Sequence, residues 1–343
     1  MSVLRVLHLV GSAVDDFYCD LSRLYAEDCL AATANLALYE FHIAYVTPDR
    51  NWRFPTSLSP EAIAAAAPMS FSAAIPVLTA LNLDLMLPQM FCIPGMTSYR
   101  ALFDLLNIPY VGNLPALMAL AANKAKTKAV VAAAGVRVPQ GELLRKGDLP
   151  QIATPVVIKP VDTDNSVGLA FVQNPDDYAV ALETAFTHAT EVLVETFIEL
   201  GREVRCGIIV QDGELLCLPL EEYLMDRENR PIRSYADKLA RSESGDLTMV
   251  AKGNDKSWIV DPSDPITDRV WTAAKKCHIA LGCRHYSLFD FRIDPHGQPW
   301  FLEAGLYCSF APTSVISTMA QAAGIPLDQL FHSMLSDAQA ISN

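Results

Sequence analysis

The sequence predicts an α/β protein with more than one compact unit, and three observations carry this prediction. Apolar runs typical of buried strands alternate with helical patterns before Leu114. After Leu114, apolar runs separated by short turn sequences predict antiparallel hairpins. The chain has 343 residues, enough for two or three domains with their own cores.

The segment before Leu114 predicts an open α/β layer. We expect strands at residues 3–10, 39–46 and 83–87, and helices at 21–38, 70–81 and 97–106. The first strand ends in Gly11 and Ser12, which is typical of a buried parallel strand leading into a loop and helix.

From Leu114 a new unit begins with an alanine-rich helix, which we expect to end at Gly135. The elements expected after Leu114 are helices at 116–134, 176–189, 266–281 and from 314, and strands at 155–159, 168–172, 191–197, 204–210 and 215–220. Residues 224–253 are polar and irregular, and a structureless stretch of that length is usually a functional loop or lid.

Composition excludes several classes of protein. With 51% hydrophobic and 19% charged residues, the chain is folded rather than disordered. A net charge of −13 argues against binding to nucleic acid or to anionic membranes, although it leaves room for a local basic pocket.

Cysteine usage and the N-terminus predict a cytoplasmic protein. None of the eight cysteines forms a CxxC pair, so we expect reduced thiols in the core. The first residues lack the features of a signal peptide, and no uninterrupted apolar stretch approaches about 18 residues, so no membrane span is expected.

Two acidic residues near the end of the chain suggest a metal site. Asp290 and Glu303 lie in apolar runs joined by the turn sequence at 294–297, which predicts carboxylates on neighbouring strands. Hard oxygen ligands at that separation suit Mg²⁺. The alternative is an ordinary hairpin that happens to carry two acids.

Lys159 closes an apolar strand and precedes a loop at 162–168 that is rich in hydroxyl and backbone N–H groups. Such a lysine and loop can hold a phosphate, although neither a P-loop nor a GxGxxG motif is present. An ordinary hairpin with an exposed lysine is the alternative.

Glu195 follows three apolar strand residues, and Glu203 comes shortly after it. An acid in that position is costly to bury unless it is paired or bound to a ligand. The pair could read an adenine edge and ribose hydroxyls, or Glu195 could mark a strand end that emerges into solvent.

Taken in order, these segments resemble the D-alanine–D-alanine ligase branch of the ATP-grasp superfamily over nearly the whole chain. No single piece is diagnostic, but the ordered set is specific. The segments that carry the resemblance are 105–112, 123–128, 134–139, 157–160, 166–168, 194–198, 281–283, 301–303 and 319–325, together with Asp290.

The resemblance implies a three-domain ATP-grasp fold with domains at 1–113, 114–203 and 204–343, and with ATP between the second and third. It implies that ATP is held by Lys124, Lys159, Asn165, Ser166, Glu195, Thr196, Phe197, Ile198 and Glu203, with adenine near Glu195 and ribose near Glu203. Asp290 and Glu303 would hold Mg²⁺, and Lys238 would close over the phosphates.

Four positions depart from the pattern of these ligases. Leu288 stands where they carry an arginine that clamps a carboxylate or acyl-phosphate, and Gly305 stands where they carry an asparagine near the metal. Ser309 replaces a substrate-binding glycine, and the serine of the phosphate-side loop falls on Asn165. These changes argue against joining two D-alanines and weaken a second metal site. Ser309 and Lys238 are the catalytic candidates.

Residues 8–24 and these departures are similar to the ligase-like enzymes of cyanobacterial mycosporine pathways. That resemblance implies condensation of an amino acid, such as serine or threonine, with the cyclohexenone acceptor mycosporine-glycine. Leu288, Tyr307 and Phe310 favour an acceptor with a ring or an apolar face.

Two alternatives remain open: a peptide or amide ligase with an unusual acceptor, and a catalytically weakened nucleotide-binding protein. The resemblance implies small-molecule substrates and leaves the oligomeric state open, with a homodimer as one option. The cation for the substrate carboxylate is also open. Arg284 and Arg292 are near in sequence, but their directions are not determined.

Overall fold

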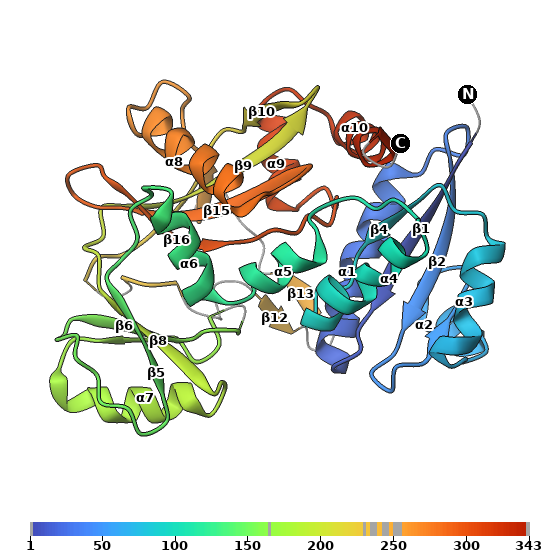
Figure 1. Cartoon of the computed structure of the whole chain (residues 1–343). Helices are drawn as coiled ribbons and strands as arrows, with labels where there is room; N and C mark the ends of the chain where they lie inside the picture. Colours follow the sequence, from blue (N-terminus) through green and yellow to red (C-terminus); the bar gives the residue numbers. More distant parts are fainter. Residues whose placement is uncertain are drawn as a thin grey trace.

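The computed structural model describes residues 3–163, 166–228, 231–233 and 256–340, and the backbone of two short strands at 239–241 and 247–249. Three larger sheets lie in separate regions of the molecule (Figure 1). One is formed before Leu114, one lies in the middle of the chain, and one is formed largely after residue 200.

The N-terminal sheet has the strand order β3-β2-β1-β4, with β1 parallel to both of its neighbours. Its elements are β1 (Leu4–Gly11), α1 (Asp16–Thr33), β2 (Tyr39–Val46), β3 (Trp52–Arg53), α2 (Pro60–Ala65), α3 (Phe71–Ala80), β4 (Leu85–Pro88), a π-helix η1 (Gly95–Tyr99) and α4 (Arg100–Leu105). The first helix begins earlier than the apolar spacing predicted, because the Asp15 carboxylate caps it by accepting from the Tyr18 N–H at 2.9 Å.

The central sheet is antiparallel in the order β5-β8-β6-β7. Its elements are β5 (Gly141–Arg145), β6 (Val156–Pro160), β7 (Ala170–Val172), the 3₁₀ helix η2 (Pro175–Asp177), α7 (Tyr178–Phe186) and β8 (Glu191–Thr196). Helix α7 packs Leu182 and Ala185 against Val156, Ile158 and Val192, so one face of the sheet is closed and the other is left for a site (Figure 1).

The single helix predicted at 116–134 was wrong. The structure has α5 (Pro115–Ala121) and α6 (Lys124–Ala133), separated where the Asn123 side chain accepts from the Lys126 N–H at 3.0 Å. Both helices belong to the core of the C-terminal sheet, through Leu117, Met118 and Val131.

The C-terminal sheet runs β14-β11-β9-β15-β16, with β10 paired to β9. Its elements are β9 (Arg202–Gln211), β10 (Glu214–Cys217), β11 (Glu221–Tyr223), β14 (Ser257–Ile259), α8 (Ile266–Leu281), β15 (Tyr286–Ile293), β16 (Pro299–Ala304), α9 (Val315–Ala322) and α10 (Leu327–Ala340). The expectation that 224–253 lacks secondary structure was wrong, since β12 (Leu239–Arg241) and β13 (Leu247–Met249) pair with each other in antiparallel orientation.

The last helix joins the two ends of the chain. Phe331 and Met334 of α10 share a core with Val6 and Leu85 of the N-terminal sheet, and α10 lies next to the end of α1 in Figure 1. The domain boundaries at 113/114 and 203/204 stay predictions, and the second lies inside β9.

The two faces of β9 and β15 have different surroundings. Val204, Cys206 and Phe289 point into an apolar core with α6 and α8. The opposite face begins apolar, with Ile209 and Leu288, and becomes charged toward residues 203–205 and 290–292. Alternation along a strand therefore aims four charged side chains at one face of this sheet.

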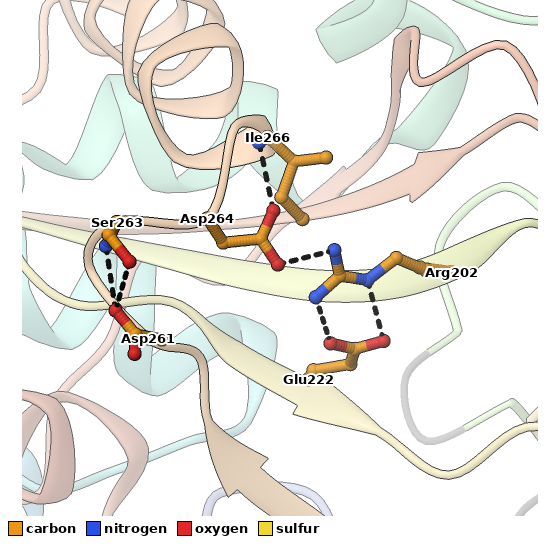
Figure 2. A network of polar contacts seen from close by, with 6 residues as sticks. All are labelled: Arg202, Glu222, Asp261, Ser263, Asp264 and Ile266. Carbon is orange, nitrogen blue, oxygen red and sulfur yellow. Dashed lines mark hydrogen bonds and ion pairs between the residues drawn. The ribbon is translucent and has the colours of Figure 1, made fainter.

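Arg202 braces the beginning of β9, as Figure 2 shows. Its guanidinium makes a two-pronged contact with Glu222 of β11 and donates to Asp264, in the loop before α8, at 2.7 Å. Asp264 in turn accepts from the N–H of Ile266, the first residue of α8, at 3.0 Å. One side chain thus connects two strands and a helix next to the charged face.

We predict that Arg202→Ala lowers the free energy of unfolding by about 1–3 kcal/mol, because it leaves two part-buried carboxylates without their charged donor. Urea denaturation measures the change. The matched control is Arg145→Ala, whose pair with Glu191 is largely solvent-exposed on the arginine side, so its effect should be small. Equal losses from the two variants would contradict the bracing role of Arg202.

Candidate active site

A cavity lies between the central and C-terminal sheets. Nine of the predicted site residues line it: Lys124, Lys159, Ser166, Glu195, Thr196, Ile198, Glu203, Asp290 and Glu303. They come from β6, β8, β9, β15, β16, α6 and the loops after β6 and β8. The fold therefore brings together residues that span 180 positions of the sequence, from 124 to 303.

Glu195 lies at the centre of a buried ion cluster. Its carboxylate is 2.6 Å from the Lys128 Nζ and also contacts the Lys159 Nζ, and the Glu195 side chain is 2% exposed. Lys159 and Glu195 stand on paired strands, whereas Lys128 reaches in from α6. Glu195 thus orients two lysines, and its predicted contact with adenine stays a prediction.

Lys128 was missed as a site residue, although it lies one helical turn after Lys124. Burial lowers the pKa of Lys128 to about 8, against the opposing effect of Glu195. Burial would raise the pKa of Glu195, but the charges of Lys128 and Lys159 outweigh it and lower that pKa. The i+4 spacing places Lys124 and Lys128 on one face of the helix, but the burial of Lys128 and its pairing with Glu195 cannot be seen in the sequence.

Lys124 ties helix α6 to the loop after β6. Its Nζ donates to the Thr163 carbonyl, and the Thr163 hydroxyl donates to the Val167 carbonyl at 3.0 Å. Ser166 follows in the same loop with a φ of +63°, and Gly168 has a φ of +71°. The loop therefore bends beside two lysines, a suitable environment for phosphate oxygens.

The other end of the cavity is formed by the segment after β8 and by Arg292. The Arg292 Nη2 donates to Glu203 at 2.8 Å and to the Pro231 carbonyl at 2.7 Å, while its Nη1 donates to the Ile198 carbonyl at 3.2 Å. Arg292 thus fixes Glu203 and Ile198 at the end of the cavity that the resemblance gave to the adenosine part of ATP.

The predicted metal pair lies on paired strands. Asp290 is opposite Glu303 on β16 and opposite Arg205 on β9, so the three side chains form a row across the sheet. The Arg205 Nε donates to Asp290 at 2.7 Å and its Nη2 at 3.2 Å. Burial raises the pKa of Asp290, and the charge of Glu303 adds to this effect.

This row fits a magnesium ion, because it places two carboxylates on adjacent strands at the wall of the cavity. In the described part of the chain no cluster of three or more His, Cys, Asp or Glu side chains could hold a metal. Magnesium does not need one, since it binds through one or two carboxylates with waters and phosphates as further ligands. Bound there, the ion would neutralise phosphate charge.

Four predicted residues are not among the described residues that line this cavity. Phe197 packs on Phe171, with ring centroids 4.3 Å apart. Ser309 is buried, and its hydroxyl accepts from the Ala311 N–H at 3.3 Å, so the geometry gives no support to a catalytic role for that hydroxyl. Lys238 and Asn165 lie outside the described residues.

Comparison with known proteins now identifies the family. The sequence profile described as D-ala D-ala ligase C-terminus matches residues 142–336, more than half of the chain. The chain belongs to the D-alanine–D-alanine ligase family. The D-alanine–D-alanine ligase of Citrifermentans bemidjiense is 30% identical over 243 residues, which cover 70% of this chain and 74% of the relative. The VanB vancomycin resistance protein of Enterococcus faecalis is 28% identical, covering 69% of this chain and 67% of that protein.

Solved structures of the family share the whole fold. The D-alanine–D-alanine ligase of Coxiella burnetii superposes with a TM-score of 0.78 at 18% identity, covering 99% of this chain and 96% of that one. The VanG D-Ala:D-Ser ligase of Enterococcus faecalis gives 0.75 at 21% identity, covering 98% and 100%. The predicted ATP-grasp fold is therefore confirmed, and with it an ADP-forming, ATP-dependent ligase.

Leu288 and Gly305, two of the four positions that depart from the family pattern, are in contact. Leu288 is 8% exposed and belongs to the apolar core that reaches the N-terminal sheet. Gly305 donates its N–H to the Leu288 carbonyl at 2.8 Å, and a Cβ on Gly305 would lie 3.8 Å from the leucine side chain. The loss of the arginine and the loss of the asparagine thus belong to one apolar patch.

The buried lysine gives a pH-dependent prediction. An unfolded Lys128 keeps its proton up to about 10.5, whereas the folded one loses it near 8. Between these values the unfolded state binds more protons, so the free energy of unfolding rises with pH. In Lys128→Met that contribution is absent. Wild type should gain on the order of 1–2 kcal/mol relative to Lys128→Met between about pH 7.5 and 9.5.

Urea denaturation at the two pH values measures this difference. Lys126→Met is the matched control, because Lys126 is exposed on the same helix and should parallel wild type at both values. If Lys128→Met also parallels wild type, Lys128 does not titrate in this range.

Proposed function

We propose that this ligase joins the amine of an amino acid to an acceptor other than D-alanine, and that the acceptor is a cyclohexenone of the mycosporine-glycine type. The observation that carries the proposal is the apolar patch of Leu288 and Gly305 beside the Asp290–Glu303 pair. Discrimination against a small amino acid follows from the absence of polar groups at these two positions, because a buried carboxylate without a partner costs several kcal/mol or more.

The proposed reaction needs no oxidant. The γ-phosphoryl group of ATP is transferred to the acceptor oxygen, leaving ADP. The amine then attacks the carbon that bears this oxygen, the C–O bond breaks as phosphate leaves, and the nitrogen gives up its protons. The product is an imine, ADP and phosphate. Lys124, Lys159 and Arg233 line the cavity and would hold phosphate oxygens, and positioning supplies most of the catalysis.

Aromatic side chains next to the site support a ring-shaped acceptor. Tyr25 of α1 packs edge-on to Phe91, with centroids 5.3 Å apart, and Phe91 lies 5.6 Å from Tyr307 in the loop after β16. These three rings connect the N-terminal region to the loop after β16, the strand that carries Glu303. Phe310, which was also expected to favour such an acceptor, is instead fully buried in the core against Tyr286 and Phe331.

The second candidate is a peptide or amide ligase with an unusual acceptor. The relatives favour it over the cyclohexenone, because those compared here carry the names of D-alanine–D-alanine ligases or resistance ligases. In that reaction ATP phosphorylates a carboxylate, and the same two departures would change the acceptor. Both candidates release ADP and phosphate, so only the joined product separates them.

We predict that the enzyme forms no D-alanyl-D-alanine and that it condenses mycosporine-glycine with a free amino acid. Mass spectrometry of reactions with ATP, Mg²⁺, mycosporine-glycine and an amino acid mixture identifies the product. A parallel reaction with D-alanine alone is the control. D-alanyl-D-alanine with mycosporine-glycine untouched would refute the proposal, and an amide product with another acceptor would favour the second candidate.

We also predict that Glu303→Gln keeps the fold and lowers the rate of ADP release by at least about 100-fold, because an amide cannot balance metal and phosphate charge. The rate is measured at saturating Mg²⁺, and circular dichroism checks the fold. Glu199→Gln, at an exposed position outside the cavity, is the control and should match wild type. Near-normal turnover in Glu303→Gln would make Glu303 structural.

A further inference from the structure

The proposed reaction leaves one charge without a partner. The amino acid carries a carboxylate, and so does a glycine-bearing acceptor, yet Leu288 offers no cation at the position where the ligases have one. A carboxylate that enters a closed site needs a hydrogen-bonding cation, and a guanidinium is the best match for its planar shape.

Arg284 and Arg292 are near Leu288 in the sequence, but both contact groups away from the Asp290–Glu303 pair. Arg292 is engaged by Glu203 and two backbone carbonyls at the far end of the cavity. Arg284 donates to the Gly112 carbonyl at 2.8 Å and stacks on Tyr110, which places it at the junction with the N-terminal unit. Neither points toward the Asp290–Glu303 pair.

Arg205 does point there, from the neighbouring strand. It is paired directly with Asp290, while Leu288 is paired with Gly207, so Arg205 is the diagonal neighbour of Leu288 on the same face of the sheet. Gly207 itself has no side chain, and Met319 and Leu218 pack over it. Chains at diagonal positions lie within reach of a long side chain, so a guanidinium from β9 can occupy space near the missing arginine of β15.

The surroundings of Arg205 favour ligand binding over a purely structural role. Its guanidinium lies on the opposite side of Asp290 from Glu303, 5.3 Å from the Tyr223 ring. The charge of Arg205 also acts on Tyr25, which begins the row of aromatic rings described above. Arg205 thus lies directly beside Asp290 of the metal pair, on the side away from Glu303.

We propose that Arg205 binds the carboxylate of a substrate and replaces, from β9, the arginine that Leu288 has displaced from β15. The proposal rests on the proposed function. It also gives the contact between Arg205 and Asp290 a second meaning. Magnesium would compete with the guanidinium for Asp290, so binding of the metal nucleotide would release Arg205 toward the incoming carboxylate. Substrate binding should therefore depend on prior binding of magnesium nucleotide.

The test compares wild type with Arg205→Met and Arg205→Lys, using serine and serinamide as the amine and mycosporine-glycine and its methyl ester as the acceptor. Arg205 binds the carboxylate of either the amine or the acceptor. For that substrate, the wild-type kcat/KM should be about tenfold or more higher with the free carboxylate than with the amide or methyl ester. Arg205→Met should abolish that preference while KM for ATP changes by less than about threefold. Arg205→Lys should retain part of it, because it keeps the charge without the fork.

Arg269→Met is the matched control, because that exposed guanidinium contacts only the Gly297 carbonyl among the bonds described for it and lies outside the cavity. It should behave as wild type. An unchanged preference in Arg205→Met, together with a raised Mg²⁺ requirement, would overturn the proposal and make Arg205 a neutralising partner of Asp290.

Calorimetry with a non-hydrolysable ATP analogue separates this proposal from the proposed function. If wild type forms no product with mycosporine-glycine, the proposed function fails. The role of Arg205 would still be supported if Arg205→Met binds the carboxylate-bearing substrate more weakly than wild type does, and only when the magnesium nucleotide is present. If wild type and Arg205→Met bind the carboxylate-bearing substrate equally well, that role is refuted, whichever product the enzyme forms.

Discussion

The site depends on two cross-strand ion pairs on one face of the C-terminal sheet. Glu203 of β9 is paired with Arg292 of β15, and two residues further along Arg205 of β9 is paired with Asp290 of β15. The charges alternate in sign both along each strand and across the pair, so no like charges stand directly opposite between β9 and β15. This arrangement lets two strands carry three buried charges and the partly buried Arg205, and it holds Glu203 and Asp290 in the wall of the cavity. The apolar residues on the opposite face supply the stability that the charged face does not.

The second requirement is that the central sheet meets this charged face at a defined distance. Glu195 provides the link, because it joins Lys159 of its own sheet to Lys128 of a helix that packs on the C-terminal sheet. A buried ion pair is a weak source of stability but a strong source of specificity, since breaking it leaves an unpaired charge. Helix α6 therefore packs against the C-terminal sheet and is joined to the central sheet by the ion pair between Lys128 and Glu195. The cavity lies where these two connections meet.

Much of the fold could be predicted from the sequence because strand and helix periods are local properties. The strand at 39–46 and the helix at 266–281 coincide with the predicted bounds. Lys159, Glu195, Asp290 and Glu303 could be predicted as well, since each is a charged residue in an apolar strand. Arg205 and Lys128 could not, because their importance depends on what stands opposite. The partner of Arg205 is set by the register between strands that are distant in sequence. The partner of Lys128 is set by the angle at which its helix packs against a sheet. The break in the helix at 116–134 was hidden for a related reason, since alanine suits both of its halves and only the Asn123 cap separates them.

The same reasoning explains how a ligase can change its acceptor without changing its fold. A side chain on β15 and its diagonal neighbour on β9 reach overlapping space, so a positive charge can pass from one strand to the other while the backbone stays in place. The vacated position then becomes apolar, and Leu288 fills it against Gly305. Under the proposed function, a charge moved to Arg205 and an apolar patch at Leu288 would alter which substrate is bound beside the Asp290–Glu303 pair. Lys128 and Lys159 are held by Glu195, and Glu203 is held by Arg292, so these residues keep their own partners. Asp290 is paired with Arg205 itself, so nucleotide binding and acceptor choice would meet at that carboxylate.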